Sequence, residues 1–354
     1  MSVAAGNAHS LFADFEGNVW GCGKNIKGCL GGLERYVPQA SIIPFLSNIC
    51  HVSSYHHSLF VDTTGNLYGC GDNGKNQLGV ESEIVRDIKK IDGIPAISCS
   101  SAGYSHSLCL SKGGEVFGCG LNSYNQLGLP SNASGWAQIP ELPSIQSLVA
   151  GFSHSLFLDV EGRVWTCGNN LNGSTGQGQS SGRTTKTPTL VDLEGAEIKK
   201  IAAGWNHSIF LDTEDRVWTV GSRIGPTQTL KPELLDLNIG AIDTISGGLH
   251  HVIVSGKEHI FGFGLNEYGS LPMDVSSYPN LIKECVPNFT NSTITEISSL
   301  FHSLFLTTKG EVWVCGTYSN PLGAEAVLEP TKLTDLPPIG KLHCSNTKSA
   351  RAVI

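Results

Sequence analysis

A short phrase of sequence recurs along this chain, and its spacing limits the folds that the chain can adopt. The clearest copy reads Ala-Gly-Tyr-Ser-His-Ser-Leu-Cys-Leu at 102–110 and continues as Gly-Glu-Val-Phe-Gly-Cys-Gly at 114–120. Both segments have the period of two that is typical of a β-strand, and a Lys-Gly-Gly turn joins them, which predicts a β-hairpin. The histidine of this phrase occurs seven times, at spacings of 48, 49, 48, 53, 44 and 51 residues: His9, His57, His106, His154, His207, His251 and His302.

The unit between two such histidines is long enough for four short strands. A strand rich in Ile, Ala and Gly comes first, then the His-Ser-Leu-Phe-Leu-Asp strand, the Gly-x-Val-Trp-x-Cys-Gly strand, and a fourth strand introduced by proline, as at 188–191. Seven copies of such a unit predict an all-β fold, a seven-bladed β-propeller of four-stranded antiparallel blades. Residues 341–354 align as a degenerate eighth copy, so we expect strands from both termini to close the ring in a shared blade.

The repeat covers the whole chain, so residues 1–354 are expected to form a single domain, which can be one domain of a longer protein. The net charge of −8, with no stripe of basic residues, argues against direct binding of nucleic acid. No apolar run reaches the roughly 18 residues of a membrane span, and we find no secretory signal peptide. We expect a monomer without a cofactor.

The 11 cysteines contain no Cys-x-x-Cys pair, and five of them occupy one slot of the repeat: Cys22, Cys70, Cys119, Cys167 and Cys315. Equivalent slots lie a blade apart, which is too far for a disulfide, and zinc is poorly supported. Reduced, buried thiols are therefore predicted, in a cytoplasmic or nuclear protein.

The seven histidines are interpreted as structural residues that hydrogen-bond backbone between strands, because one histidine per blade spreads them around a circle and cannot converge on a metal ion. A serine follows most of them, as Ser107 follows His106. Neighbouring residues of a strand point to opposite faces, so this histidine cannot serve that serine as a general base. We therefore expect no catalytic constellation and no metal site.

Three motifs together identify a resemblance. The patterns Gly-x-x-His-Ser-Leu-Phe-Leu and Gly-x-Val-Trp-x-Cys-Gly, with the Asn…Asn-Gln-Leu-Gly loops at 73–79 and 122–128, resemble the repeat of the regulator of chromosome condensation family along nearly the whole chain. The resemblance implies a seven-bladed propeller. It also implies the best-known activity of the family, guanine-nucleotide exchange on a small nuclear GTPase, through acidic residues just before certain repeat histidines and a wedge-like loop.

The residues that carry exchange in the family do not carry over to this chain. The residues before the repeat histidines are Ala8, His56, Ser105, Ser153, Asn206, His250 and Phe301, and none is acidic. The candidate wedge loop is 170–187, which is rich in Gly, Ser and Thr and holds Asn172, Arg183 and Lys186.

The loop between the repeat glycine and histidine should surface on one rim of the ring. It carries an aromatic residue in most units: Tyr55, Tyr104, Phe152, Trp205 and Phe301. These rings are either a partner-binding surface or covers for the ends of their own blades. The extra histidines of the pairs 56–57 and 250–251 are expected to face solvent.

Two functions follow. The first is a protein–protein interaction or regulatory module that binds a protein partner through this rim. The alternative is a guanine-nucleotide exchange factor, or a binding partner, for a small GTPase.

Overall fold

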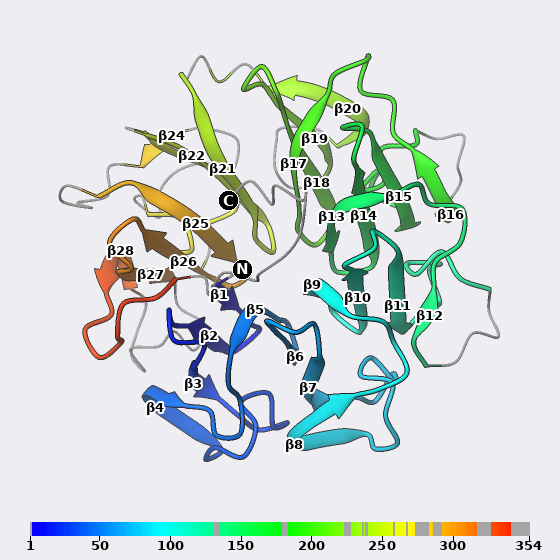
Figure 1. The fold of residues 1–354 in the computed structure, drawn as a ribbon. Coiled ribbons are helices and arrows are strands. Elements are labelled where there is room, and N and C mark those ends of the chain that lie inside the picture. The colour runs from blue at the N-terminus through cyan, green and yellow to red at the C-terminus, as the bar shows by residue number, and fades with distance from the viewer. Residues whose placement is uncertain are drawn as a thin grey trace.

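The computed structural model describes residues 2–130, 135–178, 183–222, 228–235, 237, 240–257, 259–266, 268–272, 283–285, 292–316 and 327–340. The chain forms seven four-stranded antiparallel sheets, arranged around a central axis as the blades of a propeller (Figure 1). The described residues contain no helix, and so none that is long and apolar enough to cross a membrane. The predicted fold class, an all-β seven-bladed propeller, is confirmed.

Each blade is built from four strands that follow one another in sequence, called A to D from the axis outward. Blades 1 to 4 contain β1 (Val3–Ala5), β2 (His9–Ala13), β3 (Val19–Lys24), β4 (Tyr36–Ile42); β5 (Ile49–Ser54), β6 (His57–Asp62), β7 (Leu67–Asp72), β8 (Ile84–Ile91); β9 (Ile97–Ala102), β10 (His106–Ser111), β11 (Val116–Gly120), β12 (Ala137–Gln138); β13 (Ile145–Ala150), β14 (His154–Asp159), β15 (Val164–Asn169), β16 (Thr184–Leu190). Blades 5 to 7 contain β17 (Ile198–Ala203), β18 (His207–Asp212), β19 (Val217–Gly221), β20 (Thr229–Leu235); β21 (Ile242–Gly247), β22 (His251–Gly256), β23 (Ile260–Gly264), β24 (Lys283–Cys285); β25 (Ile294–Ser299), β26 (His302–Thr307), β27 (Val312–Gly316), β28 (Val327–Lys332).

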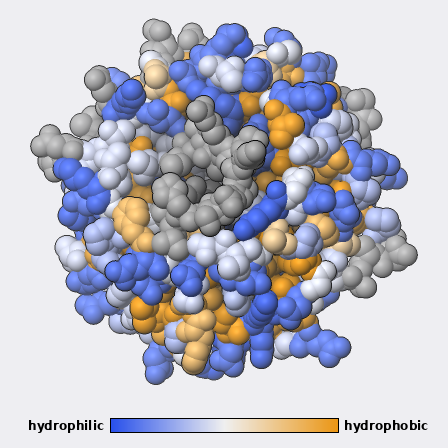
Figure 2. Space-filling view, viewed as in Figure 1, coloured by the Kyte–Doolittle hydropathy of each residue, from blue (hydrophilic) through white to orange (hydrophobic). Residues whose placement is uncertain are grey.

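The hydrophobic core lies between neighbouring blades, because strand B is apolar on both of its faces. In blade 2, Phe60 packs with residues of blade 1 such as Leu11, whereas Leu59 and Val61 pack with residues of blade 3 such as Cys109. A fully buried phenylalanine occupies the slot of Phe60 in most blades: Phe12, Phe60, Phe157, Phe210 and Phe305. On the face shown in Figure 2, hydrophobic residues lie in separate groups among hydrophilic ones.

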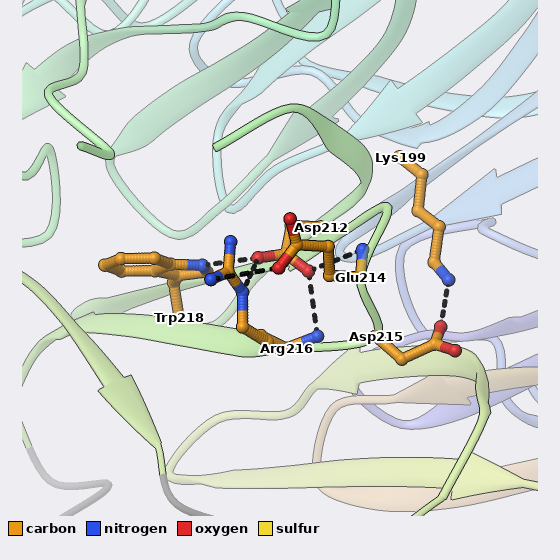
Figure 3. Close-up of polar contacts among 6 residues, drawn as sticks. All are labelled: Lys199, Asp212, Glu214, Asp215, Arg216 and Trp218. Atoms are coloured by element: carbon orange, nitrogen blue, oxygen red, sulfur yellow. Dashed lines mark hydrogen bonds and ion pairs between the residues drawn. The ribbon is translucent and has the colours of Figure 1, made fainter. Parts of the chain in front are cut away.

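In four blades, the hairpin between strands B and C is fixed by an aspartate at its start: Asp14, Asp62, Asp159 and Asp212. In blade 5, Asp212 accepts hydrogen bonds from the backbone N–H of Arg216 (2.8 Å), from Arg216 Nε (2.7 Å) and from Trp218 Nε1 (3.0 Å), and Lys199 pairs with Asp215 nearby (Figure 3). Burial raises the pKa of Asp212, but the hydrogen bonds from Trp218 and Arg216 outweigh it and lower that pKa. The repeated aspartate and tryptophan therefore hold the turn together.

The loop between strands C and D of blade 3 is organised by a half-buried asparagine. Asn122 Oδ1 accepts the Leu127 N–H at 2.9 Å, and Asn122 Nδ2 donates to the Leu129 carbonyl at 2.8 Å. Asn125, at φ +61°, takes the left-handed conformation that asparagine tolerates. The Asn…Asn-Gln-Leu-Gly motif is thus a self-closing turn.

The described residues show how the first and last blades of the ring meet. Among the described strands, no sheet combines the two ends of the chain: blade 1 holds β1–β4 and blade 7 holds β25–β28. The two blades meet side by side instead, where Glu296 accepts the Ser2 N–H at 2.9 Å and the chain after blade 7 bridges Ile339 to Asp14. Residues 341–354, the expected eighth copy, lie outside the described residues. Among the described residues, the first and last blades are therefore joined by packing, by hydrogen bonds between side chain and backbone, and by this one backbone bridge.

Candidate functional site: the histidine ring and the aromatic rim

The repeat histidines begin strand B of every blade and are almost completely buried. Six of the seven side chains reach across the gap between blades, where Nε2 meets the hydroxyl oxygen of the serine at the second position of the next blade's strand B. The ring includes the contact between the last blade and the first. The Nε2–Oγ distances are 3.2 Å for His9–Ser58, 2.7 Å for His57–Ser107, 3.1 Å for His106–Ser155, 3.0 Å for His154–Ser208, 3.2 Å for His251–Ser303 and 2.8 Å for His302–Ser10. We call these contacts the His–Ser ring.

For Ser58, Ser107, Ser155 and Ser208, the direction of the hydrogen bond follows from a second contact of the serine, with a backbone carbonyl. Ser107 donates its hydroxyl proton to the carbonyl of Gln77 at 2.6 Å, and Ser155 does the same to Gln126 at 2.5 Å. The histidine must then donate its Nε2–H to the serine, since a hydroxyl has only one proton to give. Burial lowers the pKa of His57 to about 3, so the imidazole is neutral at physiological pH.

The glycine three residues before the histidine makes room for the imidazole. A Cβ atom added to Gly103 would collide with the ring of His106, and Gly151 stands in the same relation to His154. The Gly-x-x-His spacing is therefore a steric requirement of the ring.

The structure corrects one part of our interpretation of the histidines. They are structural, but their Nε2 partner is a serine side chain of the next blade and not backbone between strands. Each pair joins His and Ser as a hydrolase would, yet His57 and Ser107 are both 0% exposed and the serine proton is committed to a carbonyl. Such a serine can neither reach a substrate nor pass its proton to the histidine.

The His–Ser ring has one gap, between blades 5 and 6. The slot that should hold the serine is Val252, so His207 Nε2 meets no serine hydroxyl, and only the backbone of His251 acts on this imidazole to oppose the lowering of its pKa. His207 is 0% exposed, and burial lowers its pKa well below the usual value.

The described cysteines are free thiols, and most are buried. Burial raises the pKa of Cys70 and Cys167, which lowers their reactivity as thiolates. The described part of the chain also holds no group of three His, Cys, Asp or Glu side chains placed to bind a metal ion.

The aromatic side chains of the loops between strands A and B meet each other across blades 2 to 5. Tyr104 stacks on Phe152, with ring centroids 4.1 Å apart, and Phe152 meets Trp205 at 5.0 Å. Tyr55 contacts Tyr104 edge-on at 5.6 Å. The rings are thus shared between blades and do not merely cover the ends of their own blades. We call Tyr55, Tyr104, Phe152 and Trp205 the aromatic row.

Two histidines extend the aromatic row at its ends, and sequence reasoning missed them. His56 meets Tyr104 at 4.9 Å, and His250 stacks on Trp205 at 4.8 Å. We expected both to face solvent, but His250 is only 7% exposed. Burial lowers the pKa of His56, and the nearby Lys27 adds to this, while Asp72 opposes it. The signal in the sequence was their position, directly after the aromatic slot in blade 2 and in blade 6.

The other predicted rim residues differ in their exposure and contacts. Tyr104 is 37% exposed, whereas Tyr55 is only 6% exposed and supports the row from below. Phe301 is separate from the row and meets Tyr268 at 5.4 Å.

The candidate wedge loop is not one continuous loop. Residues 170–178 form a turn around Asn170, whose Nδ2 donates to the Gly178 carbonyl at 3.1 Å, and Gly178 N–H bonds the Leu230 carbonyl of blade 5 at 2.8 Å. Asn172 lies half-buried in this turn, Arg183 is exposed, and Lys186 lies within β16. Residues 179–182 lie outside the described residues. A long protruding wedge is not present in the described part.

Comparison with known families gives the repeat a name. Two models of the regulator of chromosome condensation (RCC1) repeat match this chain, one at residues 113–158 and 161–211, the other at 2–29, 97–126 and 145–174. The chain is an RCC1-like repeat protein. Each match covers the histidine and the glycines that form the His–Ser ring described above.

Curated relatives of this RCC1-like chain align over a limited stretch. The regulator of chromosome condensation of Xenopus laevis is 27% identical over 107 residues, 30% of this chain and 25% of the relative. The human protein is 26% identical over the same length. The match therefore spans about a quarter of the length of these curated relatives.

Solved structures resemble the RCC1-like fold over most of its length. Human WBSCR16 superposes with a TM-score of 0.80 at 23% identity, covering 90% of this chain and 93% of that one. Prp20p of Saccharomyces cerevisiae, studied for its binding to Gsp1p and histones, gives a TM-score of 0.72 at 19% identity, covering 84% and 79%. At these identities the likeness establishes the fold.

Proposed function

We propose that this RCC1-like propeller is a regulatory protein-interaction module that binds a protein partner through the rim that carries the aromatic row. The observation that supports the proposal is the contact between rings of different blades, with Tyr104 37% exposed at its centre. Contiguous exposed aromatic side chains are typical of protein-binding hot spots.

Apolar residues of the neighbouring loops widen this surface. The loops between strands C and D lie at the same end of the blades, because the Leu121 N–H bonds the Ser105 carbonyl at 2.8 Å. They add Ile26, Tyr124 and Leu171, which are 59%, 40% and 49% exposed. A partner on this rim thus finds apolar anchors at its centre and at its periphery.

The test is affinity capture with three forms of the protein: the unchanged chain, the double variant Tyr104→Ala and Trp205→Ala, and Phe45→Ala. Phe45 is a matched control because it is 93% exposed and lies in a loop between strands D and A, at the opposite end of the blades. We expect the double variant alone to lose its partners, by at least tenfold, while its melting temperature stays within a few degrees. An identical set of partners in all three forms contradicts the proposal.

Binding or nucleotide exchange on a small GTPase is the second candidate. The similarity to the regulator of chromosome condensation and to Prp20p supports it, whereas the absence of acidic residues before the repeat histidines argues against the family's exchange mechanism. The test is the release of a fluorescent guanine nucleotide from a panel of small GTPases, with and without micromolar protein. Faster nucleotide release from one member of the panel supports exchange activity. If release is not accelerated from any member, the interaction module is the function that stands.

The free state of the described cysteines supports a cytoplasmic or nuclear location for this module. Imaging of the tagged chain in cells tests it.

A further inference from the structure

The centre of the ring holds a cavity that opens toward the aromatic row. Its volume is about 120 Å³, and strand A of every blade contributes to its wall. The wall is made of small side chains, alanines such as Ala102 and Ala203 together with serines such as Ser101 and Ser246, while Phe152 and Trp205 line the end at the rim. The aromatic row is thus one part of the mouth of the central channel.

The channel is narrow because the A strands of neighbouring blades approach each other closely. A Cβ atom on Gly247 of blade 6 would lie 2.8 Å from the backbone of Ala203 in blade 5. Only small residues fit here. Ala203 remains half-buried although strand A is the innermost strand, so its exposed part faces the channel.

Among the described residues, the pairs that precede the repeat histidines at the mouth carry no charged side chain at neutral pH. The two residues before each repeat histidine are Asn7-Ala8, Tyr55-His56, Tyr104-Ser105, Phe152-Ser153, Trp205-Asn206, Leu249-His250 and Leu300-Phe301. Burial favours the neutral form of His56. Nearby ionised groups are already paired, since Lys27 bonds Asp72 at 2.6 Å. A charged ligand would lose its hydration in this mouth without gaining a counter-ion, which is costly.

The volume matches a single large side chain. A cavity of about 150 Å³ in a protein core holds one benzene molecule, so by its volume a cavity of about 120 Å³ has room for one uncharged aliphatic or aromatic side chain. A backbone segment does not fit inside, but it can lie across the rim above.

We propose that the mouth of the channel receives one bulky, uncharged side chain, presented by a loop of the protein partner. This inference rests on the proposed function of the rim and adds the chemistry of the partner. The inserted group contacts Phe152 and Trp205 at the mouth and the alanines below them. The partner loop carries no charge next to the inserted residue.

The test uses capped amino acids as probes: the N-acetyl amides of tryptophan, leucine, lysine and glutamate. The protein is labelled with 5-fluorotryptophan, and the ¹⁹F resonance of Trp205 is assigned with a Trp205→Phe variant. We expect the tryptophan and leucine probes to shift this resonance saturably in the millimolar range, and the lysine and glutamate probes to bind at least tenfold more weakly. No saturable shift, or equal binding of charged and apolar probes, overturns the proposal.

Filling the channel separates this proposal from the function of the rim. Ala203→Leu occupies the cavity without removing a ring of the aromatic row, and Ala137→Leu is the control, on outer strand β12. We expect Ala203→Leu to abolish probe binding and partner capture while Ala137→Leu preserves both. If the rim variants lose the partner but Ala203→Leu keeps it, insertion is wrong and the rim function stands. If neither loses it, the rim function itself is wrong. Ala102→Leu is the substitute if Ala203→Leu does not fold.

Discussion

Mild acid is expected to unfold this propeller, because the His–Ser ring requires neutral imidazoles. Burial lowers the pKa to about 3 for His9, His57, His106 and His251, and to about 4 for His154 and His302. The unfolded chain, with an ordinary histidine pKa near 6.5, therefore binds more protons than the folded chain below that pH. The free energy of unfolding must fall as the pH falls.

The size of the effect follows from the number of histidines. Each histidine lowers the free energy of unfolding by about 1.4 kcal/mol for every pH unit below roughly 6.5. All seven together, including His207, lower it by roughly 10 kcal/mol per pH unit. Since domains of this kind are stable by about 5–15 kcal/mol, unfolding should fall between about pH 6 and pH 5. The hairpin aspartates act in a lower pH range. The pKa of Asp212 is lowered in the folded chain, so its contribution to the free energy of unfolding is present above about pH 4 and is lost below that pH.

The assay is guanidinium denaturation at a series of pH values from 8 to 5.5, followed by tryptophan fluorescence and circular dichroism. The slope of the free energy of unfolding against pH gives the number of protons taken up. We expect it to approach seven below about pH 6, and to fall by one in His106→Gln, which is the matched control. A change of less than about 2 kcal/mol between pH 7 and pH 5.5 would refute the reasoning, because it would mean that the histidines titrate in the folded ring.

Two substitutions test the His–Ser ring in other ways. Val252→Thr keeps the volume of valine and offers His207 a hydroxyl partner, so we expect the free energy of unfolding in denaturant to rise by about 1 kcal/mol. The control Val254→Thr, on the same strand but with no such histidine beside it, should lower the free energy of unfolding. Equal losses at both sites would contradict the role of the gap. Gly103→Ala should cost about 2 kcal/mol or more in thermal unfolding because its Cβ collides with the His106 imidazole, and an unchanged melting temperature would show that the imidazole can move aside.

The architecture could be predicted from the sequence because a short motif repeats. The period of two in 57–62 gives both faces of strand B, and the structure confirms that Leu59 and Phe60 pack toward different blades. The seven-fold repeat then sets the number of blades. These inferences need only local alternation and counting.

The partner of each histidine could not be predicted, because it lies on the next blade. His57 and Ser107 are 50 residues apart, and only the ring geometry brings them together. The contacts that join the first and last blades could not be predicted for a related reason. The eighth copy in the sequence suggested a shared sheet, and among the described strands β1 and β25 pack side by side.

The rim was predicted as a set of positions, but its organisation depends on rotamers. The spacing from the repeat histidine placed Tyr104 and Trp205 at one end of the blades. It could not tell that Tyr55 is buried beneath Tyr104, nor that His250 stacks on Trp205. Contacts between side chains of different blades depend on the radius of the ring, which no single repeat encodes.

The His–Ser ring also bears on how such a protein can change over time. A typical blade carries one serine for the blade before it and one histidine for the blade after it, as Ser107 and His106 do in blade 3. Each sheet is made from consecutive strands. Duplicating the gene segment for one blade would therefore add a complete sheet together with its histidine and its serine. A blade without this serine or histidine lacks the hydrogen bond at only one junction with a neighbour. Blade 6, with Val252 in the serine slot, is such a blade. The other junctions keep their His–Ser hydrogen bonds, so the sequences of the blades can diverge one blade at a time.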